Sequence, residues 1–240
     1  MKSITLYLSL LPLFIIMVAC TPAAKSYNFH YDINNSDREK FVNRVLLFPT
    51  QIIVREVFPG GVIEDMPSWS KMAKQIFVKE LGQYLATRMG LHTIVFQSDN
   101  ISAVIRDHTA LLKLINRSIR KHTRGWGSWP QKIDRFDYEI GPGLSYLTKQ
   151  NVDSALFVTG RQTIEIATTD ETVVDIYRYS KDQLTFGRIY LNVSLIDLRS
   201  GFILWNNIDH FDGVDIRQAN EVKPMLSHFF DTFPVSLYNN

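Results

Sequence analysis

The first 20 residues constrain this chain more than any other segment. Lys2 precedes an almost unbroken apolar run over residues 4–18, and the run ends at Ala19 and Cys20. A positive residue before a short apolar run with small residues at its end is typical of a secretory signal, because the run is short for a bilayer span. We therefore predict a signal peptide over residues 1–19, and the alternative is an uncleaved N-terminal membrane anchor.

Cys20 is the only cysteine in the chain, which excludes an internal disulfide framework and a cysteine-rich zinc site. Residues 17–20 resemble the lipobox of bacterial lipoproteins, in which the cysteine becomes the acylated first residue of the mature protein. The resemblance implies a lipid anchor on Cys20, and Thr21 rather than Asp behind it implies sorting to the outer membrane in diderm bacteria. Several acyl chains would make this attachment stable, since each buried methylene contributes about 0.8 kcal/mol and one chain alone is marginal.

Residues 21–40 are mostly polar and include Pro22 and an Asn-Asn-Ser run, which predicts a flexible tether. A flexible chain of about 20 residues averages about 25 Å end to end. We expect the lipidated cysteine and the tether over residues 20–40, and one globular domain over residues 41–240. No second linker interrupts the domain, and a chain of this length can bury a single large core.

Composition excludes two classes of protein. The chain has 26 Lys plus Arg against 24 Asp plus Glu, and removing residues 1–19 takes away only Lys2, so the mature chain carries 25 − 24, or +1. A hydrophobic content of 45% suits a packed globule rather than a disordered chain. The small net charge argues against a nucleic-acid binder, and an exported lipoprotein would rarely meet RNA.

Hydrophobic periodicity predicts an α/β fold. Strands are expected at residues 45–49, 52–58, 91–96, 155–166, 189–195 and 202–205, the last two forming a hairpin with Gly201 at its turn. Helices are expected from Pro67 to Gly90, from a cap at Ser98 or Asp99 through Ile119, and from Val222 to Phe233 before Pro234. This order predicts an α/β single-domain sandwich in which helices pack against a mixed sheet.

The helical pattern breaks from Asn116 to Arg135, where charge and aromatic residues gather. A Gly-Trp-Gly-Ser-Trp-Pro loop at residues 125–130 is flanked by six bases against Asp134, a charge of 6 − 1, or +5. Residues 137–175 carry seven acids against two bases, so charge is segregated along the chain. We predict a contact surface for a membrane, a glycan or a protein, formed by Trp126, Trp129, Arg120, Lys121 and Arg124. The alternative is a solvated loop whose rings tuck against the body of the domain.

Three passages carry a family resemblance. The strand at 45–49, the passage 147–160 and the hairpin 195–205, together with the lipobox, resemble small periplasmic lipoproteins related to the curli-export channel subunit and the penicillin-binding-protein activators. The resemblance implies an anticodon-binding-domain-like α/β fold and a role in envelope assembly or export, often within an oligomer. The sequence shows no long amphipathic hairpin pair of the kind that would form a membrane pore.

Catalytic motifs are missing from the sequence. It has no Gly-x-Ser-x-Gly elbow, no phosphate-binding loop and no His-Glu-x-x-His. The Asp-His-Phe-Asp run at 209–212 fits a solvated strand end, the Glu64-Asp65 pair fits the start of a helix, and His108 fits a helix boundary. We therefore expect no enzyme, no cofactor and no metal site.

Together these features predict an outer-membrane lipoprotein on the periplasmic face. We expect its domain to bind envelope proteins of an assembly or export system, or further copies of itself as a homo-oligomer. The alternative is a module that binds a glycan, either peptidoglycan or exopolysaccharide, and a hydrolase is a third hypothesis.

Overall fold

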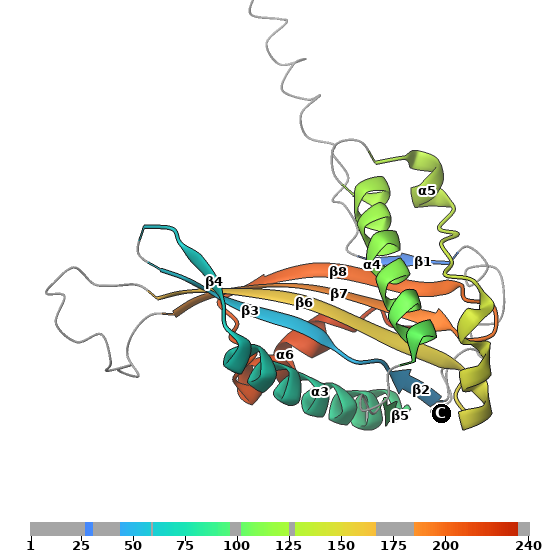
Figure 1. Cartoon of the computed structure of the whole chain (residues 1–240), viewed down its shortest axis with the longest axis horizontal. Helices are drawn as coiled ribbons and strands as arrows, with labels where there is room; N and C mark the ends of the chain where they lie inside the picture. Colours follow the sequence, from blue (N-terminus) through green and yellow to red (C-terminus); the bar gives the residue numbers. More distant parts are fainter. Residues whose placement is uncertain are drawn as a thin grey trace, which may run out of the picture.

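Strands β6 (Ser154–Ile166), β7 (Thr185–Asp197) and β8 (Ile203–Asp212) form the antiparallel centre of an eight-stranded mixed sheet. The computed structural model describes residues 27–30, 44–58, 60–96, 102–124, 128–166 and 185–234. Helices pack on both faces of the sheet, so the predicted fold class is confirmed (Figure 1).

The other strands extend this centre at both edges. β1 (Tyr27–Phe29) pairs with β8, and β6 has two parallel partners, β2 (Arg44–Leu47) and β3 (Gln51–Val57). Each of these partners pairs with one further strand, β2 with β5 (His92–Val95) and β3 with β4 (Ile63–Asp65). The break between β2 and β3 contains Pro49, which cannot donate to a ladder.

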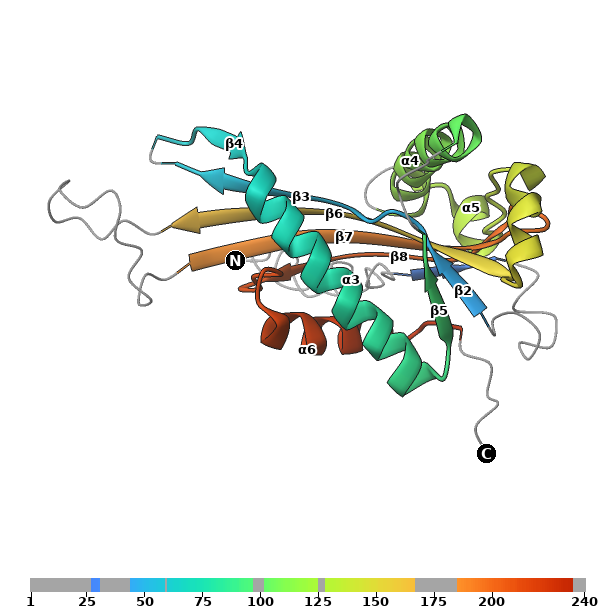
Figure 2. The same cartoon turned by 60° about the horizontal axis from the view of Figure 1, so that its bottom comes forward.

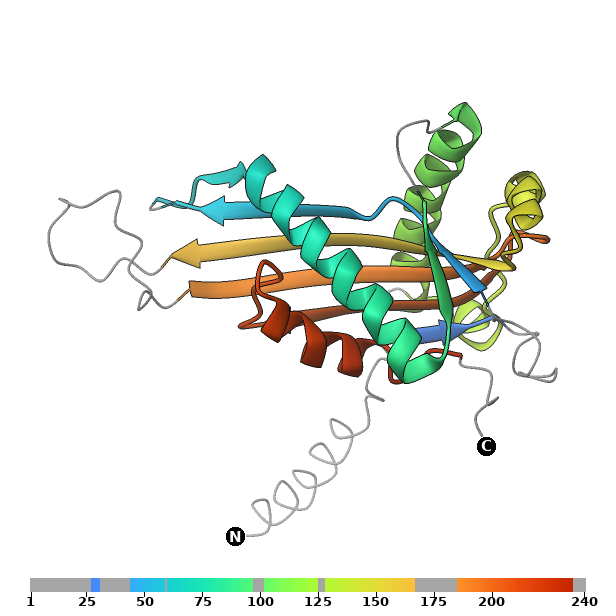
Figure 3. The ribbon, with the colours of Figure 1, turned by 90° about the horizontal axis from the view of Figure 1, so that it is seen from below.

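The first face of the sheet is covered by two helices, α3 (Pro67–Met89) and α6 (Ala219–Phe229), which lie side by side across it (Figures 2 and 3). Pro67 occupies the first turn of α3, and Gly90 ends the helix with a φ of 65°, as the sequence predicted. The core beneath these helices includes Phe77, Leu81 and Trp205, all without exposed area. α3 buries Phe77 and Leu81, with Ile76 half-buried at the margin, and α6 buries Leu226 and Phe229.

The second face is covered only over one end. There α4 (Ala103–Thr123), α5 (Pro130–Asp134) and the 3-10 helix η3 (Pro142–Gln150) stand on or beside the sheet. A second core lies under them and includes Phe48, Ile119, Leu147 and Phe157. Toward the β3–β4 hairpin, no described helix lies over this face (Figure 1).

Three predicted boundaries were wrong. The N-cap of α4 is Ser102, whose hydroxyl accepts from the Ile105 amide at 3.3 Å, whereas Ser98 and Asp99 lie outside the described residues. α4 continues to Thr123 and α5 follows, where we expected the helical pattern to break, because the stripe that includes Ile119 and Thr123 is buried on the sheet.

The third wrong boundary is the end of α6, which lies at Phe229 rather than Phe233. The chain turns there and brings Phe233 against Trp205, with ring centroids 5.0 Å apart.

The segment that we predicted to be a tether contains an unexpected strand. In it Tyr27 lies opposite Asn207 and Phe29 opposite Trp205, at the edge of the sheet. His30 follows, buried and stacked on Phe202 with centroids 4.6 Å apart. At these four residues the tether prediction is corrected, because β1 pairs with β8, Phe29 packs against the core and His30 stacks on Phe202 in the turn before β8. The signal peptide and the rest of the tether lie outside the described residues and stay predictions.

Candidate functional site

The end of α4 and the short α5 project from the sheet on the side opposite α3 and α6 (Figure 1). The last two turns of α4 expose Arg117, Arg120 and Lys121, which we call the basic end. Among the described residues none forms an ion pair with these three side chains. The basic end therefore presents uncompensated positive charge to the solvent.

Trp129 connects this helix end to α5. Its indole is half-exposed and stacks on His122, with centroids 4.1 Å apart and ring planes 12° apart. Its backbone amide donates to the His122 carbonyl at 2.7 Å, and His122 Nδ1 lies 2.8 Å from the Tyr138 hydroxyl. The structure therefore places the half-exposed Trp129 ring against His122, the residue that follows Arg120 and Lys121 in α4.

Tyr138 is held beneath this stack by charged neighbours. Lys132 pairs with Asp137 at 2.5 Å and lies over the Tyr138 ring, 5.2 Å from its centroid. Burial, and to a lesser extent the charge of Asp137, raises the pKa of the Tyr138 phenol, so the hydroxyl stays protonated at neutral pH. This arrangement fixes α5 against the end of α4.

Arg124 has a different role from the one its sequence context indicated. Its Nη1 donates to the backbone carbonyl of Ile208 in β8, so the side chain points into the body rather than outward. Burial lowers the pKa of this guanidinium to about 10, and Asp209 partly offsets that effect. Arg124 is still charged at neutral pH and braces the end of α4 against the sheet. Trp126 and Cys20 lie outside the described residues, so their roles stay predictions.

A buried polar network fixes α4 on the sheet. Asn116 Oδ1 accepts from the Ser194 hydroxyl at 3.1 Å, and the Asn206 amide donates to Ser194 Oγ and to Asn192 Oδ1, both at 2.9 Å. Asn116 is the only polar link that α4 makes into this network within the described residues. The network sets which helix face meets the sheet and, in turn, which face carries the basic end.

We expect Asn116→Ala to lower the free energy of unfolding by about 1 to 3 kcal/mol, because it leaves a buried hydroxyl donor without its acceptor. Arg117→Ala, the adjacent exposed position, is the control and should change stability by less than about 0.5 kcal/mol. Denaturant melts measure both, and amide exchange should show the loss of protection concentrated in α4. Equal melts for the two variants would contradict this role of the network.

We expect Trp129→Ala to cost about 1 kcal/mol or less, because half of the ring is already in solvent and the stack on His122 contributes little more. In a domain of this size the melting temperature should then fall by about 4 °C or less. The fully buried Trp205→Ala is the control, with an expected cost of about 3 to 5 kcal/mol. If both variants melt equally low, the Trp129 ring is structural. The same small effect is expected of the double variant Trp126→Ala with Trp129→Ala.

A second surface, which the sequence did not indicate, is the uncovered part of the second sheet face. One register row crosses four strands there: Ile53, Arg161, Tyr190 and His210 are successive neighbours. Ile53 is 41% exposed and Tyr190 is 49% exposed, and the Tyr190 and His210 rings stack with centroids 5.7 Å apart. We call this row and its neighbours the open sheet face.

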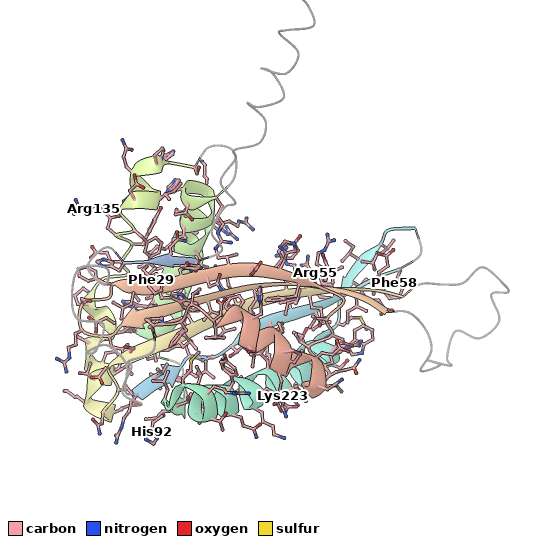
Figure 4. All side chains as sticks on the ribbon, turned by 180° about the vertical axis from the view of Figure 1, so that it is seen from behind. Phe29, Arg55, Phe58, His92, Arg135 and Lys223 are labelled. Carbon is pink, nitrogen blue, oxygen red and sulfur yellow. The ribbon has the colours of Figure 1, made fainter. Side chains whose placement is uncertain are left out.

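Two further rows complete the open sheet face. On the side away from α4, Arg55 pairs with Asp65 and Arg188 with Asp212, both at 2.6 Å. On the side toward α4, the row consists of Gln51, Thr159, Asn192 and Ile208. The apolar alternation in β7 indicated a polar face, but only the position of α4 shows which part of that face is covered. In Figure 4, Arg55 and Phe58 lie toward one end of the sheet and Arg135 and Phe29 toward the other.

The weaker catalytic candidates do not converge. Asp209 and His210 are successive strand residues with 3.9 Å between Asp209 Oδ1 and His210 Nδ1, and Asp212 pairs with Arg188. Glu64 and Asp65 end β4 directly before the Met66 N-cap of α3, as expected, and Asp65 pairs with Arg55. His108 Nδ1 lies 2.8 Å from the Val104 carbonyl of its own helix. Within the described ranges no three potential metal ligands come together.

Comparisons with known proteins give only distant likenesses. No family model and no curated protein matches the chain. Three solved structures are similar in part. A PelC dodecamer from Paraburkholderia phytofirmans is 11% identical with a TM-score of 0.32 and covers 80% of this chain and 89% of its own. A neuraminyllactose-binding hemagglutinin homolog from Helicobacter pylori is 14% identical with a TM-score of 0.37, covering 86% and 91%.

Lipoprotein GNA1162 from Neisseria meningitidis is 11% identical with a TM-score of 0.33, covering 78% of this chain and 95% of its own. Identities and TM-scores this low leave the function of this chain to be argued from its own residues. The family resemblance of the three sequence passages likewise stays a prediction, whereas the α/β fold class that it implied is the one observed.

Proposed function

We propose that this chain is an outer-membrane lipoprotein, anchored through acylated Cys20, whose domain binds a protein of an envelope assembly or export system. The anchor is supported by the sequence, through the apolar run over residues 4–18 and the single cysteine that follows it. No helix in the described part of the chain is long and apolar enough to cross a membrane. Attachment through the acylated cysteine is consistent with that observation.

The proposal of partner binding rests on the open sheet face. Its central row of Ile53, Arg161, Tyr190 and His210 comes from four hydrogen-bonded strands, so the side chains are held on a rigid platform. A half-exposed tyrosine and an exposed arginine are residue types that supply much of the binding energy at protein interfaces. Because ion pairs neutralise the adjacent Arg55 and Arg188, a partner would meet a surface of mixed rather than single-sign charge.

The same surface supports a glycan as the second candidate ligand. The stacked Tyr190 and His210 rings offer an aromatic platform, and Asn192 and Thr159 in the neighbouring row are half-buried polar side chains. Aromatic rings beside polar groups suit a sugar, whose face is apolar and whose edge carries hydroxyls. No catalytic group is needed for either candidate.

The test introduces a photo-crosslinking residue at Tyr190 and, as the control, at Tyr146 of η3, which is similarly exposed at 42%. We expect one discrete protein adduct from position 190 and none from position 146 in cells. The paired variant Tyr190→Ala with Arg161→Ala should abolish complex formation with that partner, whereas Tyr146→Ala with Lys149→Ala should not.

The same two paired variants, Tyr190→Ala with Arg161→Ala and the control Tyr146→Ala with Lys149→Ala, separate the alternatives. If mature protein pellets with purified cell-wall sacs and only the Tyr190 pair abolishes pelleting, the glycan candidate replaces the protein partner. If light scattering shows a discrete oligomer that only the Tyr190 pair dissociates, the partner is a second copy of this chain. If the experiments give no adduct, no pelleting and no oligomer, binding at this face is contradicted.

A further inference from the structure

The anchored edge of the domain lies beside the basic end. Asn28 in β1 has its side-chain amide 3.5 Å from the Thr123 hydroxyl in the last turn of α4. Only residues 21–26 separate Cys20 from Tyr27, and seven residues of fully extended chain span at most about 25 Å. Whatever path that segment takes, the anchor point lies within about 25 Å of the edge strand that contacts α4.

We propose that the α4–α5 end of the domain faces the bilayer and docks on its anionic headgroups, an inference that rests on the proposed acylation of Cys20. The short connection places this end, rather than the far β3–β4 hairpin, next to the membrane. The sequence left a membrane, a glycan or a protein as the ligand of this surface. The proposal selects one of them, a lipid bilayer that exposes negative charge.

The chemistry of this end fits that occupant. Arg117, Arg120 and Lys121 give it uncompensated positive charge, which attracts an anionic bilayer surface within about a Debye length. Trp129 is 50% exposed and Ile133 on α5 is 45% exposed. An indole and an aliphatic side chain beside bases suit the interface, where amphipathic rings lie at headgroup depth.

Pairing of β1 with β8 would also limit how the domain can rotate at the membrane. A flexible tether of 20 residues would leave the domain free to rotate beneath the membrane, whereas pairing of β1 with β8 leaves only residues 21–26 between Cys20 and the sheet. The open sheet face then remains on the same domain, displaced along the sheet from the docked end (Figure 4).

The test uses the acylated mature protein in vesicles of phosphatidylethanolamine and phosphatidylglycerol. Because Cys20 is acylated, a single introduced cysteine can be labelled with a fluorophore, at Gln131 on α5 or, as the control, at Gln83 on α3, both exposed. With a quencher on the lipid headgroups, we expect quenching at Gln131→Cys at least about threefold greater than at Gln83→Cys. Equal quenching, or greater quenching at position 83, would overturn the orientation.

Charge is tested separately. Arg120→Glu with Lys121→Glu should reduce the quenching at position 131 by at least about half, as should high salt or vesicles without phosphatidylglycerol. Lys71→Glu with Lys79→Glu, two exposed bases of α3, should leave it unchanged. Quenching that is insensitive to charge would overturn the docking on anionic headgroups.

Flotation of the same samples separates this inference from the proposed anchor. Protein that floats with the vesicles but shows no quenching at position 131 overturns the orientation and leaves the anchor intact. Protein that does not float overturns both. If cell-wall sacs rather than vesicles change the fluorescence at position 131, the surface binds glycan and the bilayer proposal is wrong.

Discussion

Phe229→Ala is expected to lower the free energy of unfolding by about 3 to 5 kcal/mol, enough to unfold a marginal domain. The Phe229 side chain has no exposed area, and its ring lies against Phe230, Trp205 and Phe211, with centroids 5.4, 6.2 and 6.2 Å away. Truncation would leave a cavity where α6 meets the sheet, because the rigid β8 strand cannot move in to fill it. Phe77→Ala on α3 should cost a similar amount.

Denaturant melts measure this loss, and Met72→Ala supplies the control. Met72 lies on α3 but is 49% exposed, so its truncation should cost less than about 0.5 kcal/mol. A loss under about 1 kcal/mol for Phe229→Ala or Phe77→Ala would mean that these faces do not form the core.

Cys20→Ser is expected to release the protein from membranes or to leave it unprocessed, because the chain contains no other thiol to acylate. Fractionation together with mass spectrometry of the mature N-terminus measures both outcomes. Thr21→Asp is the matched control: it keeps the acylated cysteine and should change only the sorting between the two membranes. A Cys20→Ser variant that is processed normally and stays in the outer-membrane fraction would contradict the anchor.

Local pattern was sufficient to predict much of the fold. The apolar stripe of α3, with Pro67 at its start and Gly90 at its end, determines a helix by spacing and by backbone chemistry alone. The β7–β8 hairpin follows from alternating residues around Gly201, whose φ of 81° is one that other residues rarely adopt. These features depend on neighbours in the chain, so a single sequence contains the information.

The candidate sites depended on contacts between distant segments. Arginine is usually a surface residue, yet Arg124 points inward and donates a hydrogen bond to the carbonyl of Ile208. No rule of sequence spacing predicts that pairing. β1 was missed because three residues of edge strand leave too short a pattern, and their place is set by β8.

The sequence by itself determined the anchor motif, the helices, the long strands and which residues of each strand share a face. Only the tertiary structure decided which faces are covered, because coverage depends on where α4 and β1 pack. The row of Ile53, Arg161, Tyr190 and His210 exists only once β3, β6, β7 and β8 take their register. Periodicity fixes the direction of a side chain relative to its own strand, whereas burial requires a second element to arrive from elsewhere in the chain.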